Sequence, residues 1–359
     1  MIKFLHAADL HLGSPFATLP PAAAKQRRAE LFETATEIVE LCNSSGCQFL
    51  LLAGDVCETA EAARAFARLL AACTAEVVIA PGNHDPYGQP GPYSTIAWPE
   101  NVSVFDDTEM ARLRFEDLNC DIYGAAFMEE TAPSLMEGFK VLDPKAVNIM
   151  VLHGDPEQAA SPYNPISAEQ IAHSGLDYLA LGHIHSYSGP RSAGGTTYAW
   201  PGVPAGRGFD ETGVKGVIMG QVESGKPAEL EFVPLHARKY ETLSVEVGTD
   251  PAASIRAALP ADTGRDIYRI TLTGSSEPLD VRALASGLRD VFYQLTLRDE
   301  TTRITALWEG MDQDNLRGLF LRQMRAQWEK AADEETRQIC EQAVRFGLAA
   351  IDGKEAPAR

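Results

Sequence analysis

The chain has 359 residues, of which 45% are hydrophobic and 23% charged, and 31 basic against 50 acidic residues give a formal net charge of −19. This composition is typical of a globular protein with a sizeable core, and no apolar stretch reaches the roughly 18 residues that a membrane span needs. The acidic balance argues against a broad surface for polyanions. A nucleic acid would have to be held by metal ions, by a local basic strip or with the help of another subunit.

The first two-thirds of the chain repeat one pattern, in which a short apolar run ends in a polar motif. The first run opens the chain, and because MIKFLHAADLHLG lacks the basic start and cleavage site of a signal peptide, we expect a cytoplasmic protein. Helical patterns follow from about Ala22 to Cys42 and from about Glu58 to Ala72. The apolar runs suit strands buried on both faces, and they lie at Ile2–His6, Phe49–Leu52, Val77–Ala80, Val147–Leu152 and Tyr178–Leu181. Strands that alternate with helices predict an α/β layered core, which collects its ligands at the carboxyl ends of the strands.

Beyond about Leu235 the pattern changes to that of a small second domain. Its predicted elements alternate strand, helix, strand, helix and strand, at Tyr240–Val247, Pro251–Leu259, Ile267–Thr273, Leu279–Val291 and Phe292–Arg298. Two amphipathic helices follow from Asn315, with apolar stripes of Leu316, Phe320, Met324 and Trp328 and of Ile339, Ala343, Phe346 and Ala350. We expect these stripes to pack on the protein's own core, and a docking surface for a partner is the alternative.

The motifs at the ends of the apolar runs hold residue types that bind metals. They are Asp9-Leu10-His11, Gly54-Asp55, Gly82-Asn83-His84-Asp85, His153-Gly154-Asp155 and Gly182-His183-Ile184-His185. Asp9 and His11 are two residues apart, as are His183 and His185, so each pair faces one way in an extended segment. All five motifs therefore point to one edge of the predicted core.

A pair of divalent cations about 3.5–4 Å apart needs a carboxylate that bridges them and nitrogen or oxygen ligands on either side. An isolated histidine is more often a hydrogen-bonded loop residue, but five of the eight histidines stand in these motifs. Gly54 and Gly82 let the backbone turn sharply before Asp55 and Asn83. The motifs predict a two-metal site, and the absence of cysteine from them points to Mn²⁺, Fe or Zn²⁺.

The order D-x-H, G-D, G-N-H-D, H and G-H-x-H resembles that of the calcineurin-like metallophosphoesterase superfamily. The segments HAADLHLGSPF, HGD, LGHIHSY and YAWPGVPAGRGFDETGVKGV are similar to those of its DNA-repair exonuclease branch, the SbcD-like nucleases. The resemblance implies an α/β fold with a layered β-sandwich core flanked by helices. It also implies a catalytic domain at 1–236, a β-α-β-α-β capping domain at 237–302 and a C-terminal helical segment at 303–359, which is a candidate dock for a partner.

The resemblance also assigns roles to individual residues. One metal is expected to be held by Asp9, His11, Asp55 and His185, and the other by Asp55, Asn83, His153 and His183, with Asp55 as the bridge. His84 is the expected catalytic histidine, which stabilises the transition state or protonates the leaving oxygen, and Asp85 is expected to hold its imidazole.

Two arginines and one acidic pair are less clearly placed. Arg191 and Arg207 are candidate phosphate contacts because arginine forks match phosphate oxygens, but solvated loop arginines are an equal alternative. Asp210 and Glu211 suggest a solvated loop, and only Asp210 gains interest from the motif GRGFDE.

Three functions remain open from the sequence. The resemblance implies a Mn²⁺-dependent DNA nuclease, a 3′-to-5′ exonuclease or single-strand endonuclease, which forms a homodimer and works with a coiled-coil ATPase of the SMC type. The second function is a phosphoesterase for a small molecule or phosphoprotein, since fold and metals do not fix the substrate. The extra domain favours a large substrate, whereas the net charge favours a small one. The third is a catalytically idle scaffold in a repair complex, against which the complete ligand set and His84 speak.

Overall fold

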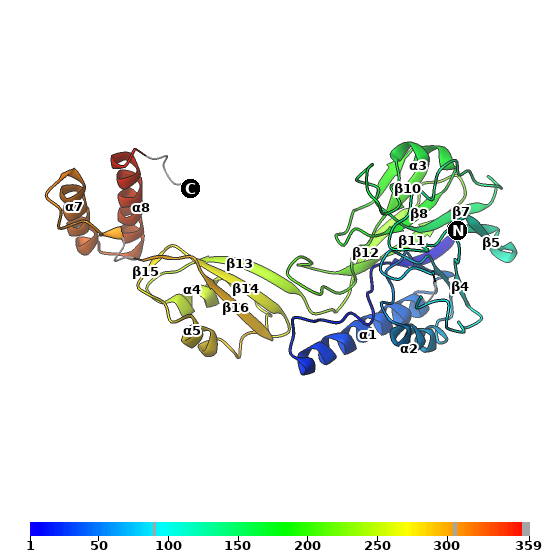
Figure 1. Cartoon of the computed structure of the whole chain (residues 1–359), viewed down its shortest axis with the longest axis horizontal. Helices are drawn as coiled ribbons and strands as arrows, with labels where there is room; N and C mark the ends of the chain where they lie inside the picture. Colours follow the sequence, from blue (N-terminus) through cyan, green and yellow to red (C-terminus); the bar gives the residue numbers. More distant parts are fainter. Residues whose placement is uncertain (89–90, 304–306, 354–359) are drawn as a thin grey trace. The chain divides into compact units, whose positions relative to one another are not determined.

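The computed structural model describes residues 1–88, 91–303 and 307–353, and its contacts divide the chain into two compact units, Met1–Lys239 and Tyr240–Arg359. Figure 1 labels the helices and many of the strands of both units. The predicted limit between the first two domains, 236/237, lies close to the division between the units. The predicted limit at 302/303 adjoins residues 304–306, which lie outside the described residues. The three domains stay a prediction.

The first unit contains two six-stranded sheets. The first sheet has the order β12 (Glu229–Pro234), β11 (Gly216–Val222), β1 (Ile2–Ala7), β2 (Phe49–Leu52), β3 (Glu76–Ile79) and β4 (Val102–Val104), in which β1 to β4 are parallel. The second has the order β5 (Ala111–Phe115), β6 (Cys120–Gly124), β7 (Val147–His153), β8 (Tyr178–Gly182), β10 (Thr196–Ala199) and β9 (Arg191–Ala193), in which β6, β7, β8 and β10 are parallel. The short 3-10 helix η1 (Glu116–Leu118) lies between β5 and β6. All five predicted apolar runs form strands.

The inner faces of the two sheets pack together. Phe4 on β1 stacks on Tyr178 on β8, with ring centroids 4.6 Å apart. Next to them, His6 Nε2 donates to the Leu181 carbonyl at 3.0 Å and the Tyr178 hydroxyl donates to His6 Nδ1 at 2.8 Å. These bonds join one sheet to the other, and the predicted layered β-sandwich is confirmed.

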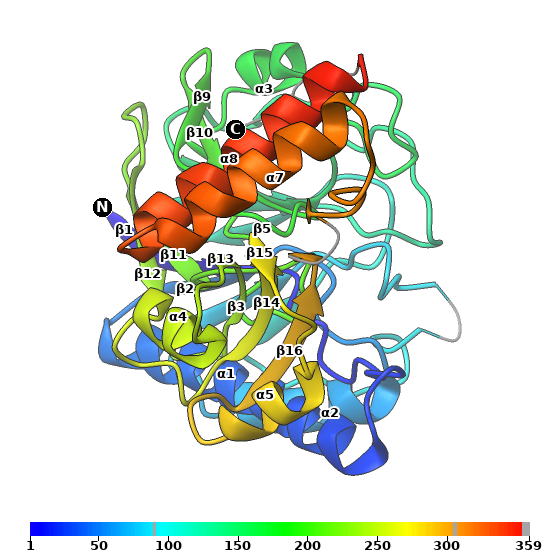
Figure 2. The same cartoon turned by 90° about the vertical axis from the view of Figure 1, so that its left-hand side faces the viewer.

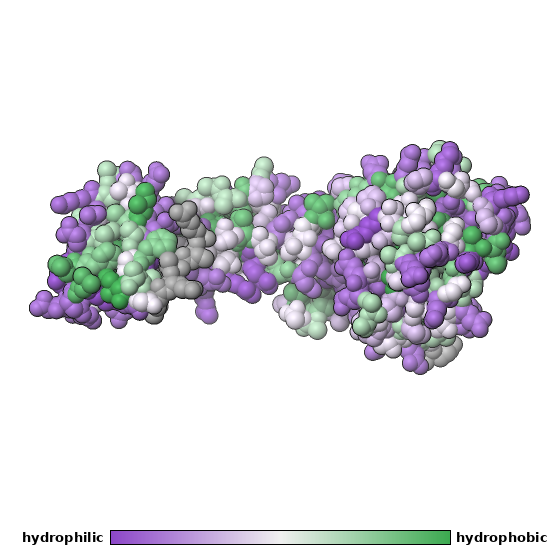
Figure 3. All heavy atoms as spheres, turned by 90° about the horizontal axis from the view of Figure 1, so that it is seen from above, coloured by the Kyte–Doolittle hydropathy of each residue, from purple (hydrophilic) through white to green (hydrophobic). Residues whose placement is uncertain are grey.

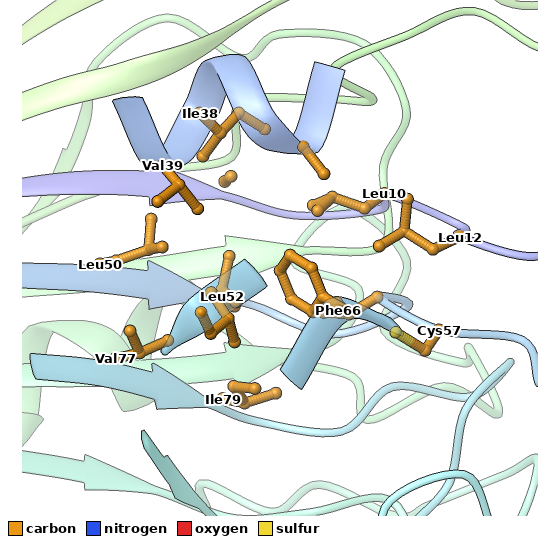
Figure 4. Packing of buried hydrophobic residues seen from close by; sticks show 14 of the residues in the cluster. Leu10, Leu12, Ile38, Val39, Leu50, Leu52, Cys57, Phe66, Val77 and Ile79 are labelled. Carbon is orange, nitrogen blue, oxygen red and sulfur yellow. The ribbon is translucent and has the colours of Figure 1, made fainter. Parts of the chain in front are cut away.

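Helices cover the outer faces of both sheets. Leu50 and Leu52 of β2 pack with Phe66 against α1 (Pro21–Ser44) and α2 (Ala60–Leu70), as Figure 4 shows. The alternate residues of the same strand, Phe49 and Leu51, face the inner core. Since both faces are buried, β2 is apolar throughout its length. On the second sheet, α3 (Ala168–Ser174) packs through Ile171.

The second unit begins with a three-stranded parallel sheet. Its elements are β13 (Tyr240–Glu246), α4 (Pro251–Ala258), β14 (Ile267–Thr273), α5 (Val281–Gly287) and β16 (Gln294–Asp299), with a small pair of strands β15 (Ser275–Ser276) and β17 (Thr302–Arg303). The predicted β-α-β-α-β order is present, because parallel neighbours need a crossover connection. The helix α5 is shorter than the predicted range 279–291, since it ends at Gly287, a poor helix former.

The helices α7 (Leu316–Lys330) and α8 (Glu334–Ile351) run side by side (Figure 2). They share a small core that contains Leu321 and Val344. The apolar stripe predicted on α8 does not face this core, because the side chains of Ile339 and Phe346 are 60% and 39% exposed. This corrects the expectation that the stripe packs on the protein's own core. The physical reason is that α8 has two apolar faces. The residues of one face directly follow those of the other in sequence, and Cys340 and Val344 lie on the face that is buried.

Figure 3 shows hydrophobic residues on the surface of this helical pair. Besides Ile339 and Phe346, the exposed ones are Leu316 and Leu319 on α7, at 68% and 60%. Among the described helices, none is long and apolar enough to cross a membrane.

Candidate metal centre and active site

The parallel strands of both sheets deliver the predicted site residues at their carboxyl ends. Asp9 and His11 follow β1, Asp55 follows β2, Asn83 follows β3, His153 ends β7, and His183 and His185 follow β8. Four of them leave their strands with a backbone in the left-handed region, with φ values of 55° for Asp9, 47° for His11, 52° for Asp55 and 95° for His183. Non-glycine residues in this region are uncommon and concentrate at functional sites, where the surrounding structure holds them.

The side chains of these residues converge. Ligand atoms of Asp9, His11 and His185 lie within 4.8 Å of one another, and so do those of Asp9, Asp55 and His153. Asp55 Oδ2 lies between the two groups, 3.8 Å from His11 Nε2 and 3.5 Å from His153 Nε2.

The last two candidate ligands lie beside the second group. Asn83 Oδ1 is 2.9 Å from His153 Nε2, and the His183 ring is 5.2 Å from the His153 ring, between centroids. All seven predicted ligands therefore lie together, with the Asp55 carboxylate between the two groups.

A positive charge between the carboxylates and histidines of this site would stabilise them. Burial raises the pKa of Asp9, and nearby Asp55 adds to that rise. Burial alone would also raise the pKa of Asp55, but His153 and His11 outweigh it, so the pKa of Asp55 is lowered. His11 Nε2 is buried and has no hydrogen-bond partner among the described atoms. Buried carboxylates and an unpaired ring nitrogen are the donors that a divalent cation satisfies, so the site fits a pair of such ions.

The surroundings of His153 also indicate a cation site. Its Nδ1 donates to the Ala53 carbonyl at 2.9 Å, which turns Nε2 towards the oxygens of Asn83 and Asp55. Burial would lower the pKa of His153, but Asp55 and Asp9 raise it above its ordinary value. A cation between His153 and these carboxylates would therefore compete with a proton for the same ring nitrogen.

The two glycines leave space for candidate ligands. Gly54 has a φ of 82°, in agreement with the predicted sharp turn, and a Cβ on it would lie 2.4 Å from His153 Nδ1. A Cβ on Gly82 would lie 2.3 Å from Asp55 Oδ1, so a larger residue would displace the Asp55 carboxylate.

Two glutamates that the sequence did not single out support the ligand histidines. His11 Nδ1 donates to Glu58 Oε1 at 3.0 Å, and His185 Nδ1 donates to Glu211 Oε1 at 2.8 Å. Burial alone would raise the pKa of Glu58, but its bonds with His11 and Ser14 lower it. The solvated-loop interpretation of Glu211 is wrong, because this side chain is buried. The only sequence signal is nearness to a motif: Glu58 is three residues after Asp55, and Glu211 lies in GRGFDE.

Arg207 contacts these two glutamates. Its Nη2 donates to Glu211 Oε1 at 2.8 Å, and its Nη1 lies 3.4 Å from Glu58 Oε1. In this structure the guanidinium is bound to carboxylates, and a phosphate contact by Arg207 stays a prediction. Arg191 Nη2 lies 3.4 Å from Glu157 Oε1, and Arg191 Cζ lies 4.7 Å from the centroid of the Trp200 ring. The side chain of Arg191 is 44% exposed. Its role as a phosphate contact stays a prediction.

Asp85 differs from its predicted role as a partner of the His84 imidazole. Its buried carboxylate accepts hydrogen bonds from the backbone N–H groups of Asp55, Val56, Cys57 and Gly82, at 2.5–3.0 Å. The Tyr93 hydroxyl donates to it at 2.5 Å. Asp85 is thus a positioning residue that fixes the loop of the bridging carboxylate.

His84 lies at the open side of the site. Its backbone N–H donates to Asp55 Oδ1 at 2.9 Å, and its side chain is exposed. Its ring approaches the His11 ring edge-on, with centroids 5.3 Å apart. The imidazole is therefore next to the candidate metal ligands and accessible to a substrate.

Comparison with known proteins gives one family. The family model for calcineurin-like phosphoesterases matches residues 2–187. An uncharacterized metallophosphoesterase of Bacillus subtilis (strain 168), YhaO, is 31% identical over 266 residues, which are 68% of this chain and 63% of the relative. The DNA double-strand break repair protein Mre11 of Methanopyrus kandleri is 25% identical over 262 residues, 65% of this chain and 56% of the relative. The chain thus spans less than two-thirds of the length of either relative.

Among solved structures, the protein TT1561 of Thermus thermophilus is similar with a TM-score of 0.39 and 13% identity, over 64% of this chain and 98% of that one.

Proposed function

The chain belongs to the calcineurin-like phosphoesterase family, whose fold holds divalent metal ions for the hydrolysis of phosphoesters, and we propose that it is a two-metal phosphodiesterase that cleaves DNA. The observation that carries the proposal is the place of the Asp55 carboxylate between His11 and His153, with Asp9 in both groups of ligand atoms. Of the relatives, Mre11 of Methanopyrus kandleri is a DNA repair protein by its description, which supports DNA as the substrate.

We assign the ligands as the resemblance to the family implies: Asp9, His11, Asp55 and His185 for one ion, and Asp55, Asn83, His153 and His183 for the other. Two divalent cations, proposed to be Mn²⁺, would polarise the phosphoryl oxygens and lower the pKa of the attacking water. With the charges of Asp9 and Asp55 included, the loaded site has a formal charge of +2. A site loaded in this way would attract a phosphodiester although the net charge of the chain is −19.

The chain's own groups then act on the leaving oxygen. The bond from the His84 backbone to Asp55 fixes the residue beside the bridging carboxylate, and its exposed imidazole faces the substrate side. There His84 donates a proton to the departing sugar oxygen, and Asp85 keeps the loop of Asp55 in place.

Digestion of end-labelled DNA tests the proposal. Purified protein with Mn²⁺ is incubated with single- and double-stranded DNA, and a cyclic nucleotide and a phosphopeptide are assayed in parallel. We expect DNA cleavage, with shortening from the 3′ end, and a loss of at least about 100-fold for His84→Ala and for Asn83→Ala. His173→Ala is the matched control, because this histidine is exposed on α3 and bonds to the Glu169 carbonyl of its own helix.

The parallel substrates decide between the functions. Turnover of the cyclic nucleotide or phosphopeptide without turnover of DNA would overturn the nuclease assignment in favour of a phosphoesterase for those substrates. A protein that binds two metals and is inert on every phosphoester would be a scaffold. Full activity of His84→Ala with both metals bound would remove His84 from the mechanism.

We further propose that residues 1–236 form the catalytic domain, 237–302 a capping domain and 303–359 a partner dock, in a homodimer. The exposed apolar side chains of α7 and α8, Leu316, Leu319, Ile339 and Phe346, support a coiled coil of an SMC-type ATPase as the partner. Calorimetric titration with such a coiled coil should give binding that Ile339→Ser and Phe346→Ser together abolish. Unchanged binding by this variant would contradict the dock.

A further inference from the structure

Both histidines in the group Asp9, His11 and His185 have a carboxylate at the ring nitrogen that points away from the site. His11 Nδ1 donates to Glu58 at 3.0 Å and His185 Nδ1 to Glu211 at 2.8 Å. Because a carboxylate only accepts, Nδ1 carries the proton in each ring and Nε2 is left free as a ligand. Such a partner fixes the ring and makes the ligating nitrogen more basic.

A single arginine joins the two carboxylates. The Arg207 backbone N–H donates to Glu211 Oε2 at 2.7 Å and its Nη2 to Glu211 Oε1 at 2.8 Å, so both oxygens of Glu211 are held. On the other side, Arg207 Nη1 lies 3.4 Å from Glu58 Oε1, to which the Ser14 hydroxyl also donates at 2.8 Å. These contacts connect segments near residues 14, 58 and 207, so the two histidines are oriented together.

The histidines of the other proposed metal have no such support. His153 Nδ1 donates to the neutral carbonyl of Ala53. The His183 ring lies against the rings of His153 and Tyr163, at 5.2 and 5.1 Å between centroids. Among the carboxylates in the described part of the chain, only those of Asp9 and Asp55, which are proposed ligands themselves, come within 4 Å of the nitrogens of either ring. Asp9 belongs to both groups of ligand atoms, so the carboxylates alone do not separate the two sites.

We propose that the two metal sites differ in affinity: the site of Asp9, His11 and His185 binds its ion tightly, the site of Asn83, His153 and His183 exchanges its ion readily, and Arg207 is the positioning residue that creates the difference. The inference rests on the ligand assignment of the proposed function and adds to it an order of loading. Removal of groups that support metal ligands typically costs 10–100-fold in metal affinity, so we expect the two affinities to differ by about that factor.

Titration of the metal-free protein with Mn²⁺ tests this inference without any substrate. Electron paramagnetic resonance of the free ion counts bound Mn²⁺, and two classes of site, one ion each, are expected. Arg207→Ala should weaken the tight class about 10–100-fold and leave the weak class unchanged, whereas Asn83→Ala should remove the weak class alone. Arg191→Ala is the matched control, since the partner of this arginine, Glu157, contacts no proposed ligand through its side chain in the described structure.

Two further variants separate positioning from folding. Arg207→Lys keeps the charge but loses the planar guanidinium that contacts both glutamates, so its tight-class affinity should lie between those of Arg207→Ala and the wild type. Glu211→Gln leaves the arginine in place and should weaken the tight class as well. Circular dichroism of each metal-free variant checks its fold.

Equal affinities in the wild type, or an unchanged tight class in both Arg207→Ala and Glu211→Gln, would overturn the inference. The failure of the proposed function looks different: two metals of unequal affinity with no DNA cleavage would leave the inference standing. A protein that binds no Mn²⁺ would refute both.

Discussion

The Asp85 carboxylate collects five donors in the interior of the first unit. Three are the backbone N–H groups of Asp55 and of the two residues after it, the fourth is that of Gly82, and the fifth is the Tyr93 hydroxyl. The loop after β2 is therefore held by hydrogen bonds to a residue of the loop after β3. A carboxylate with several N–H donors can replace the regular backbone partners that a loop lacks.

Asp85→Ala should therefore destabilise the fold strongly. The substitution leaves buried donors without an acceptor, each of which costs about 1–3 kcal/mol, so we expect a loss of at least about 3 kcal/mol in the free energy of unfolding. Tyr93→Phe is the matched control, which removes one donor and should cost about 1 kcal/mol. Urea unfolding of the metal-free protein measures both. An Asp85→Ala protein as stable as Tyr93→Phe would contradict the positioning role.

His6 makes the stability of the first unit depend on pH. Burial lowers the pKa of His6 to about 3, although the Leu181 carbonyl acts in the opposite direction. In the unfolded chain the pKa is near the ordinary 6.5, so below pH 6.5 the unfolded chain takes up a proton that the folded protein does not. The stability that neutral His6 contributes is complete above pH 6.5 and falls as the pH decreases towards 3, by about 2 kcal/mol between pH 7 and pH 5.

The comparison of wild type with His6→Gln checks this effect, with urea unfolding at pH 7, 6 and 5 in a chelator. The variant should be less stable at pH 7, where it lacks the bonds between the sheets, but its stability should fall by about 2 kcal/mol less on acidification. Parallel pH curves for the two proteins would show that His6 does not contribute.

At the residue scale, the sequence predicts ligands better than their supports. The convergence of Asp55 and His153 was predictable because each lies in a polar motif at the carboxyl end of a buried strand. Glu58 and Glu211 were not, because their roles depend on which way a loop turns its side chains in space. Asp85 was placed beside His84 by adjacency in sequence, whereas its carboxylate lies among backbone amides.

At the scale of helices and strands, the sequence predicts which residues are buried where the apolar pattern allows only one arrangement. Strand β2 has both faces covered, so its apolar run identified it. Helix α8 has two apolar faces, and only the position of α7 decides which of them is buried. The pattern of Ile339, Ala343 and Phe346 was as regular as that of Cys340 and Val344, so periodicity could not choose between them.

A matched pair of substitutions tests the orientation of these helices. Leu321 is fully buried between α7 and α8, so Leu321→Ala should cost about 2–5 kcal/mol in the stability of the helical pair. Ile339 is 60% exposed, and Ile339→Ser should change stability by no more than about 0.5 kcal/mol. Trp308 and Trp328 adjoin this core, so tryptophan fluorescence during urea unfolding reports on it. A large loss for Ile339→Ser would show that the outer face is covered.

At the scale of the molecule, the first unit is built so that parallel strands of its two mixed sheets end at one place. The carboxyl ends of β1 and β2 from one sheet meet those of β7 and β8 from the other, and the candidate ligands lie where they meet. The sequence predicted this convergence from the position of the five motifs at the ends of the apolar runs. It could not predict the substrate, because that depends on surfaces outside the shared chemistry of the family.

Such a site should make metal a structural as well as a catalytic partner. Asp9 and Asp55 are buried side by side, and burial raises the pKa of Asp9, so its charged form is unfavourable in the metal-free fold. Mn²⁺ at 100 times the dissociation constant of a site should add about 2.7 kcal/mol to the free energy of unfolding for that site. Asp9→Asn keeps the shape and can still accept from the His183 N–H, which bonds to both carboxylate oxygens at 3.2 Å.

We therefore expect Asp9→Asn to raise the melting temperature of the metal-free protein and to lose most of the gain on addition of Mn²⁺. Calorimetric melting curves with chelator and with increasing Mn²⁺ measure both effects, and the addition of Na⁺ at equal ionic strength controls for screening. The opposite result, a variant that is less stable without metal and gains as much from Mn²⁺ as the wild type, would mean that Asp9 is a structural residue of the sandwich. In that case the strained backbone at Asp9, with its φ of 55°, would have no metal to explain it.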